Sequence, residues 1–153
     1  MDVKTLSPLT PVPPANPESE AFWTATARDR LLVKVCNSCN KVHVYPRAHC
    51  PFCFSVDTEW RESPGGGEIY SYTVMRRETP PRVVSYVRLD EGVILLTNIV
   101  GCDPDEVHIG QRVKVVFPRA EDGPCVPAFV PASLAQELAY RSEVSASRTH
   151  EED

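Results

Sequence analysis

Four cysteines in two closely spaced pairs are the residues of this chain best suited to chemistry. Cys36 and Cys39 form one Cys-x-x-Cys pair, and after ten intervening residues Cys50 and Cys53 form another. Each pair places two sulfurs on one tight turn, and two such turns together supply the four thiolates of a tetrahedral metal site. A site closed by four protein ligands leaves no open position for a substrate. We therefore expect a structural zinc ion.

The residues around the two pairs separate zinc from its alternatives, which are rubredoxin-type iron and a pair of disulfides. Asn40 tolerates the left-handed backbone that such turns often need, and Pro51 stiffens the second turn. Rubredoxin-type sites usually carry Gly directly after each pair, where this chain has Asn40 and Phe54. Nothing in the sequence points to secretion, where disulfides would be expected. The spacing favours zinc.

Outside these cysteines, the sequence offers little catalytic equipment. No histidine has a serine or cysteine partner at a recognisable motif spacing, and His43 is expected at the surface. Cys102 and Cys125 are better explained as small buried or loop residues than as nucleophiles. Asp103 and Asp105 flank Pro104, which favours a solvated turn over an acid/base pair. We predict no catalytic residue.

Three arginines are the candidate ligand-binding residues, because they bracket the loop Thr79-Pro80-Pro81. Arginines on a loop can hold phosphate through paired hydrogen bonds, although ordinary surface charge is the competing interpretation. Three tyrosines nearby offer a stacking platform for bases, but their alternation favours packing in the core or at the rim of a barrel. The arginines are Arg76, Arg77 and Arg82, and the tyrosines are Tyr70, Tyr72 and Tyr86.

Composition limits the classes of protein to which the chain can belong. It has 153 residues, of which 42% are hydrophobic and 24% charged, and a formal net charge of -5. Acidic character argues against a nucleic-acid partner, which needs a basic face to displace counterions. The sequence contains neither an apolar run long enough to cross a membrane nor the apolar core of a signal peptide. We expect a cytoplasmic protein without a membrane partner.

The elements that must position the cysteines come first along the chain. Residues 1–16 are rich in proline and are expected to form an extended arm. Asn16-Pro17-Glu18 predicts the start of a helix within residues 17–30, with Asn16 as its cap. Residues 31–62 are expected to form the zinc ribbon, with short strands entering and leaving the first cysteine pair. Because this segment is too short to bury a core of its own, the metal must supply much of its stability.

A glycine-rich stretch, Ser63–Gly67, marks the expected boundary between the ribbon and a main β-domain over residues 63–131. Alternating apolar residues predict five strands, which suit a small OB-fold barrel better than a sandwich. Residues 132–153 are expected to form a short helix to residue 141 and a disordered tail. The predicted fold class is therefore mainly β: an N-terminal helix, a rubredoxin-like zinc ribbon and a five-stranded OB-fold barrel. The five strands are expected near residues 69–76, 83–89, 93–100, 111–117 and 126–130.

Taken together, these parts resemble the zinc-ribbon/OB-fold family of acyl-CoA-associated proteins, long catalogued as a domain of unknown function. The likeness covers roughly residues 17–131. It rests on the aromatic helix, the two cysteine pairs with Pro46-Arg47 between them, and three barrel segments. These are Phe22-Trp23, the four cysteines, Gly65–Val74, Val87–Gly92 and Ile109–Val115.

The resemblance implies a role beyond what the residues alone indicate. Family members are small partners of thiolase-like thiolases, aldolases and acyltransferases, including retro-aldolases of steroid side-chain degradation, and the partner carries the catalytic residue. We accordingly expect a non-catalytic subunit of a hetero-oligomeric acyl-CoA-processing complex that forms or cleaves C–C bonds, and not an enzyme on its own. The resemblance carries over the metal ligands Cys36, Cys39, Cys50 and Cys53, and makes Arg76, Arg77 and Arg82 candidates for contacting CoA. The alternative is a nucleic-acid-binding ribbon/OB module.

Overall fold

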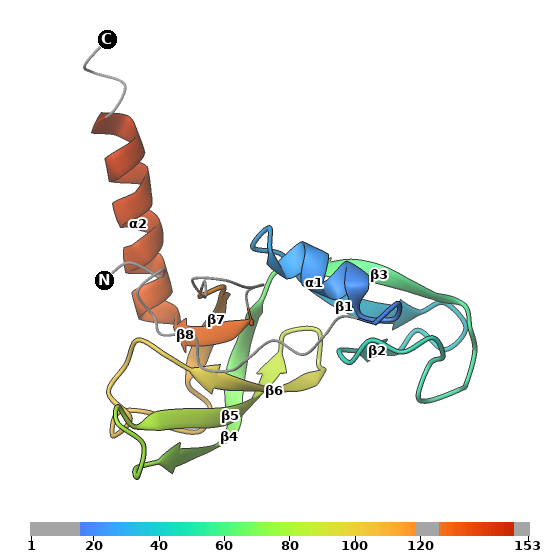
Figure 1. Ribbon diagram of the computed structural model, residues 1–153, viewed down its shortest axis with the longest axis horizontal. Coiled ribbons are helices and arrows are strands. Elements are labelled where there is room, and N and C mark those ends of the chain that lie inside the picture. Colours follow the sequence, from blue (N-terminus) through green and yellow to red (C-terminus); the bar gives the residue numbers. More distant parts are fainter. Residues whose placement is uncertain (1–15, 119–125, 149–153) are drawn as a thin grey trace.

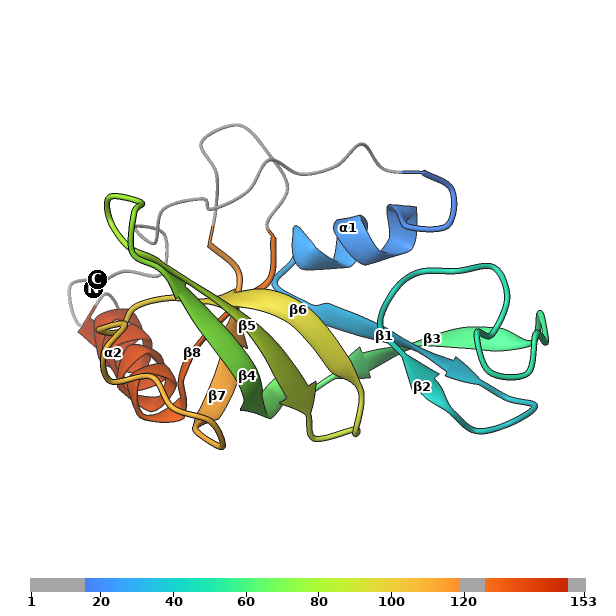
Figure 2. The same cartoon turned by 90° about the horizontal axis from the view of Figure 1, so that it is seen from below.

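The computed structural model describes residues 16–118 and 126–148, with side chains through residue 140. The arm predicted for residues 1–16 therefore lies, apart from Asn16, outside the described residues. A three-stranded ribbon sheet projects from one side of a closed barrel, and a C-terminal helix projects from the other (Figures 1 and 2). Along the chain the elements are α1 (Glu20–Thr26), β1 (Leu31–Cys36), β2 (Val42–His43), β3 (Thr58–Ser63), β4 (Gly66–Met75), β5 (Arg82–Leu89), β6 (Ile94–Ile99), β7 (Arg112–Val116), β8 (Ala128–Pro131) and α2 (Ala132–Arg148).

Helix α1 is shorter than expected, because Asn16 closes a turn ahead of the helix instead of capping it. The side chain of Asn16 accepts a hydrogen bond from the backbone N–H of Ser19 at 2.9 Å, and the Ser19 hydroxyl lies 3.1 Å from the Asn16 N–H. The helix ends before Asp29, whose φ of 58° is left-handed. Its buried residues, Ala25 and Thr26, face the chain's own strand β1.

The ribbon sheet has the strand order β2-β1-β3. Strand β1 pairs antiparallel with β3 along its whole length, from Leu31 opposite Ser63 to Cys36 opposite Thr58. The sequence did not predict β3, because Thr58–Ser63 is polar and shows no long apolar alternation. Pairing with the apolar strand β1 nevertheless fixes it as a strand, and it carries the chain from the second cysteine pair to the barrel.

The barrel closes in the order β4-β5-β6-β8-β7. Its strands fall within a few residues of the predicted segments, and the inward residues Val83, Val87 and Leu89 of β5 are buried as expected. The prediction of a mainly β fold with a ribbon and an OB-type barrel is therefore confirmed. Tyr70 and Tyr72 differ from expectation, because both are exposed. A register shift between Ile69 and Ser71 places Tyr70 at a bulge, next to the buried Ile69, whereas Tyr72 pairs with the buried Ser85 and is nevertheless 37% exposed.

One hydrophobic core joins the ribbon to the barrel. Leu31 and Val33 of β1 and Val44 after β2 belong to the same buried cluster as Val87 and Phe129 of the barrel. The ribbon was expected to be too short to bury a core of its own. Its apolar residues instead pack in the core of the barrel. The two sheets are separate in hydrogen bonding but continuous in packing.

Of the three glycines at the predicted boundary, Gly65 precedes strand β4 and Gly66 and Gly67 begin it, where β5 and β7 approach closely. A Cβ on Gly67 would lie 2.5 Å from the backbone carbonyl oxygen of Arg88, and one on Gly65 would overlap the side chain of Val115. Gly65 also has a φ of +73°, which L side chains rarely adopt. These glycines are therefore required by close packing of the barrel strands.

Helix α2 is longer than the sequence predicted. It continues through residues 142–148, which were expected to be disordered. No Gly or Pro interrupts the chain from Ala132 to Arg148, so nothing local ends the helix at residue 141. Its first turn packs on β7 and β8, where Leu134 and Ala135 cover Val116 and Val130. Within the described residues, no helix is both long and apolar enough to cross a membrane.

Candidate functional site

The four predicted metal ligands come together at the end of the ribbon sheet. The sulfur atoms of Cys36, Cys39, Cys50 and Cys53 all lie within 4.8 Å of one another. Two of these separations are 3.6 Å, between Cys36 and Cys53, and 3.7 Å, between Cys39 and Cys50. In a tetrahedron with Zn–S bonds of about 2.3 Å, the sulfurs would be about 3.8 Å apart. The arrangement therefore fits a structural zinc ion.

Two similar backbone turns hold the cysteine pairs. The N–H of Asn40 donates to the carbonyl of Cys36 at 2.8 Å, and the N–H of Phe54 donates to the carbonyl of Cys50 at 2.9 Å. Both donors are left-handed, with φ of 57° at Asn40 and 63° at Phe54. Asparagine adopts this conformation readily, whereas a bulky aromatic residue does so at a cost. At the two turn positions where glycine is usual, this chain therefore has Asn40, which adopts the left-handed conformation readily, and Phe54, which is strained by it.

The pKa values of two thiols in the cluster move in opposite directions. Burial raises the pKa of Cys50, but backbone N–H groups of Phe52 and Cys53 outweigh it and lower that pKa to about 7. The backbone N–H of Ser55 lowers the pKa of Cys53, but burial and the neighbouring cysteines raise it to about 12. Four thiolates this close together repel one another, so a bound cation favours their charged form.

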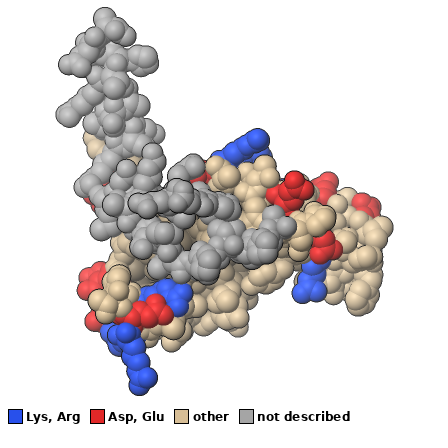
Figure 3. All heavy atoms as spheres, in the orientation of Figure 1, with Lys and Arg blue, Asp and Glu red and all other residues tan. Residues whose placement is uncertain are grey.

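The candidate phosphate-binding arginines lie around the β4–β5 hairpin, and carboxylates already engage two of them. Arg76 contacts Asp105 at 2.6 Å, and Arg82 contacts Glu78 at 2.8 Å. Asp105 raises the pKa of Arg76 through a side-chain hydrogen bond. Arg77 is exposed, and among the described residues it has no hydrogen bond or ion pair. On the face shown in Figure 3, basic and acidic side chains are interspersed, without a broad basic patch.

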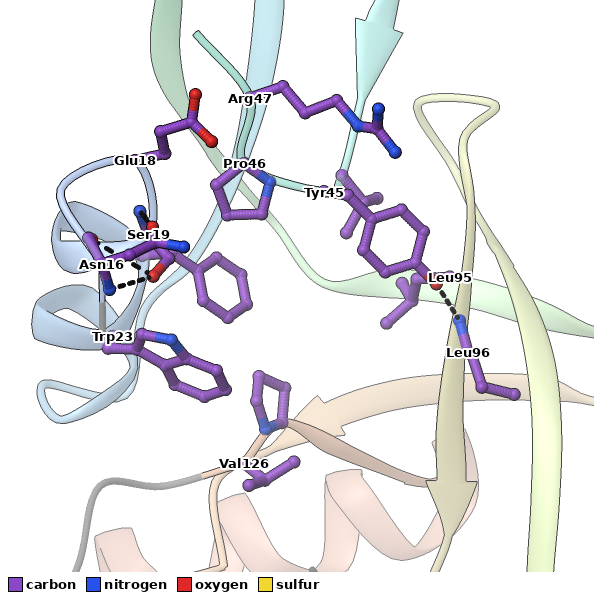
Figure 4. A pocket seen from close by; sticks show the side chains of 13 residues that line it. Asn16, Glu18, Ser19, Trp23, Tyr45, Pro46, Arg47, Leu95, Leu96 and Val126 are labelled. Atoms are coloured by element: carbon purple, nitrogen blue, oxygen red, sulfur yellow. Dashed lines mark hydrogen bonds between the residues drawn. The ribbon is translucent and has the colours of Figure 1, made fainter. Parts of the chain in front are cut away.

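A cleft of about 640 Å³ opens between α1, the loop after β2 and strand β6. Its wall is mostly apolar and includes three aromatic side chains (Figure 4). Sequence reasoning missed this cleft, because its residues come from four separate stretches of the chain. The aromatic residues are Phe22, Trp23 and Tyr45. The other apolar lining residues are Val44, Pro46, Leu95, Leu96, Val126 and Pro127, and the polar ones are Asn16, Glu18, Ser19 and Arg47.

The outer face of the barrel carries exposed aromatic and aliphatic side chains. Tyr86 of β5 lies opposite Leu96 of β6, and the two are 45% and 50% exposed. Tyr70 is 48% exposed, and the guanidinium of Arg88 lies 4.7 Å from its ring centroid. The structure therefore presents these tyrosines as a surface, where packing in the core or rim was expected.

Several other histidines and cysteines are dispersed along the chain. His43 of β2 is buried, contrary to expectation: it pairs with Lys34 of β1, and its Nδ1 lies 3.1 Å from the carbonyl oxygen of Tyr45. His49 is exposed and is not part of the cysteine cluster. Cys102 is half-buried in a loop, and burial raises its pKa. Cys125 and His150 lie outside the described residues.

Comparisons with known proteins match both halves of the chain. Residues 23–59 match the family domain described as the rubredoxin-like zinc ribbon domain of ChsH2, and residues 60–118 match the C-terminal OB-fold domain of ChsH2. A probable enoyl-CoA hydratase alpha subunit of Thermomonospora curvata is 36% identical over 130 residues. That alignment covers 81% of this chain but only 41% of the length of the relative.

Shorter relatives and a solved structure match over more of their own length. A DUF35 domain-containing scaffold protein of Methanocaldococcus jannaschii is 35% identical over 97 residues, or 58% of this chain and 68% of that protein. A similar scaffold protein of Methanothermobacter thermautotrophicus is 35% identical over 102 residues, covering 62% of this chain and 77% of its own. Among solved structures, a chain of the Ltp2-ChsH2(DUF35) aldolase superposes with a TM-score of 0.71 at 33% identity, covering 79% of this chain and 99% of that one.

Proposed function

Because this chain belongs to the DUF35 family of zinc-ribbon/OB-fold proteins, we propose that it is a non-catalytic accessory subunit of an acyl-CoA-processing complex. Its partner would be a thiolase-like subunit that supplies the catalytic residue for forming or cleaving a C–C bond. The likeness to nearly the whole of a chain from the Ltp2-ChsH2(DUF35) aldolase carries this proposal. The names of two relatives as scaffold proteins support the same role.

The zinc site suits such a role, since its four cysteines could hold a structural ion. A zinc ion bound there would fix the two turns and the end of the ribbon sheet. The four sulfurs would fill its coordination shell and leave no position for a substrate. The site would therefore hold the ribbon in shape and take no part in a reaction.

We propose that the exposed face of the barrel contributes to docking the partner. Tyr86 and Leu96 form an exposed pair across neighbouring strands, with Tyr70 beyond them on β4. Tyrosine is enriched at protein interfaces, because it adds a large apolar ring with a polar end at low conformational cost. The same face is rigid, since the barrel core lies directly beneath it.

For contact with CoA, we propose Arg77 as the first of the three candidate arginines. Its guanidinium has no carboxylate partner among the described residues, so it can bind phosphate without losing an existing contact. Arg76 and Arg82 would first have to exchange Asp105 and Glu78 for the phosphate. These pairs are at least partly exposed, and such pairs contribute little stability, so the exchange is a modest obstacle.

Co-expression with a candidate thiolase-like subunit tests the proposal. We expect a stable complex in which acyl-CoA turnover requires both chains, and no turnover by this chain alone. Tyr86→Asp should weaken the complex by about tenfold or more, since a buried interface tyrosine is often worth over 1 kcal/mol. Tyr140→Asp is the control, because Tyr140 is also an exposed tyrosine (67%, against 45% for Tyr86) and lies away from this face, on α2. Turnover by the isolated chain would refute the proposal.

A nucleic-acid-binding module remains the second candidate, and the exposed tyrosines on an OB-type barrel are the observation that favours it. The net charge of -5 opposes it. A gel-shift titration with single-stranded DNA and RNA at moderate salt decides between the two. Tight binding that Tyr86→Asp abolishes would support the module, whereas weak binding would leave the accessory role.

A further inference from the structure

The cleft beside α1 has the features of a groove for an extended, proline-rich segment. Grooves of this kind are lined by aromatic rings, against which a preformed polyproline helix packs. Here Trp23 and Tyr45 lie on opposite sides of the cleft (Figure 4). Phe22 also lines it, with its ring centroid 5.1 Å from that of Trp23. The volume of about 640 Å³ is enough to enclose several side chains.

Hydrogen bonds hold the two walls in place. The carboxylate of Glu18, ahead of α1, accepts a hydrogen bond from the backbone N–H of Ala48 at 2.9 Å, which ties the helix to the ribbon loop. The hydroxyl of Tyr45 accepts from the N–H of Leu96 at 3.4 Å, which ties that loop to the barrel. The cleft is therefore formed before a ligand binds, and no binding free energy is lost in ordering its walls.

Two aromatic side chains of the cleft, Trp23 and Tyr45, can each donate a hydrogen bond to a bound segment. Among the described residues, the indole N–H of Trp23 has no hydrogen-bond partner. The Tyr45 hydroxyl accepts one bond and still has its own proton to donate. A polyproline helix has no internal hydrogen bonds, so all its carbonyl oxygens are free to accept. The groove and this kind of backbone are complementary.

The sequence of the arm has the period of such a helix. A polyproline helix has three residues per turn, so residues three apart share an edge. One edge is aliphatic, the second is proline, and the third is mostly polar. The edges consist of Leu6, Leu9 and Val12; of Pro8, Pro11 and Pro14; and of Lys4, Ser7, Thr10 and Pro13.

We infer that the cleft is the docking site for the chain's own arm, residues 1–15, bound as an extended polyproline helix. Asn16 lines the cleft, so the arm leaves the described structure at the rim of this groove. Tethering at that point gives an effective concentration in the millimolar range, which fills even a weak groove. The aliphatic edge packs against Phe22 and Trp23, and the polar edge faces solvent.

Fluorescence quenching of the zinc-loaded full chain tests this inference. The chain has two tryptophans, so Trp60→Phe leaves Trp23 as the reporter. In that background Leu9→Asp, on the aliphatic edge, should raise the acrylamide quenching constant of Trp23 about twofold as the docked population falls. Thr10→Asp, which adds the same charge on the polar edge, is the matched control and should leave the constant unchanged. Equal quenching in the two variants would overturn the inference.

Two further measurements check that the change in quenching comes from Trp23 and from docking within one chain. In the chain that retains Trp60, the NMR signal of the Trp23 indole N–H should shift with Leu9→Asp, and that of Trp60 should not. Docking within one chain also predicts quenching that is independent of protein concentration. A constant that changes on dilution, together with a dimer by mass, would place the arm on a second copy and overturn the intramolecular assignment. None of these readouts involves the thiolase-like partner, so they are independent of the proposed function.

Discussion

Phe54 occupies a backbone conformation that is costly for a bulky residue. Its φ of 63° closes the second cysteine turn, and its side chain is 78% exposed, so burial on this chain returns little of the cost. The left-handed conformation costs L residues about 1–2 kcal/mol. Since Phe54 lowers the stability of the isolated chain, its presence beside the metal site points to another requirement at this position.

We predict that Phe54→Gly stabilises the zinc-bound chain. Relief of the left-handed strain exceeds the entropy that glycine adds to the unfolded chain, for a net gain of about 0.5–1 kcal/mol. Thermal unfolding should show a rise in Tm of about 2–4 °C per kcal/mol. Phe52→Gly is the control, because Phe52 has no left-handed φ and stacks against Lys41, so this change should destabilise. A Tm that falls in both variants would contradict the strain argument.

Asp90 gives the stability of the chain an acid-sensitive component. Arg112 holds both carboxylate oxygens of Asp90, at 2.8 and 2.9 Å, and lowers the pKa of Asp90 through this hydrogen bonding. Because the folded pKa lies below the unfolded one, the pair stabilises the fold above about pH 4 and is lost as pH falls through the folded value. Both side chains are about half exposed, so the effect is small.

We predict that Asp90→Asn flattens the loss of stability as pH falls below about 4, as measured by urea unfolding at a series of acidic pH values. Arg112→Gln should flatten it to the same extent, and combining the two changes should add nothing further. Additive effects of the two substitutions would show that the groups act separately.

At the scale of elements, strand β4 depends on glycines that let neighbouring strands approach. Gly66 and Gly67 are adjacent in β4, but a Cβ would meet different obstacles at each. At Gly67 it would meet the backbone oxygen of Arg88 at 2.5 Å, and at Gly66 the carboxylate of Asp90 at 2.6 Å. A side chain can rotate away, whereas the backbone of a paired strand cannot.

Gly67→Ala should therefore destabilise the protein by about 1–3 kcal/mol, the usual cost of overpacking. Gly66→Ala is the matched control and should cost less, since the Asp90 side chain can move. Denaturant unfolding of both variants gives the comparison. A larger loss at Gly66 than at Gly67 would contradict the assigned role of the Arg88 carbonyl.

At the scale of the whole molecule, the shared core couples the metal site to the barrel. Leu31, Val33 and Val44 of the ribbon segment pack in one cluster with Val87 and Phe129 of the barrel. Zinc can contribute on the order of 10 kcal/mol or more to the folding of small ribbons. A ribbon that loses its metal would expose one side of this common core.

We therefore predict that chelation destabilises the barrel as well as the ribbon. Hydrogen exchange at the amides of Val87 and Phe129 should accelerate by at least about tenfold after zinc is removed, which corresponds to roughly 1.4 kcal/mol. Restoring zinc should restore the protection, which separates metal loss from irreversible damage. Unchanged exchange at both amides would mean that the barrel folds independently of the ribbon.

The sequence by itself determined the features that depend on local spacing. Two Cys-x-x-Cys pairs define a four-sulfur cluster because each turn is short, and alternation from Val83 to Leu89 defines a strand with one buried face. Only the tertiary structure decided where distant segments meet. Tyr70 lies exposed at a bulge of β4, His43 is buried, and four separate stretches of the chain line the cleft. Each of these outcomes depends on packing and strand register between residues far apart in the chain, which no local pattern encodes.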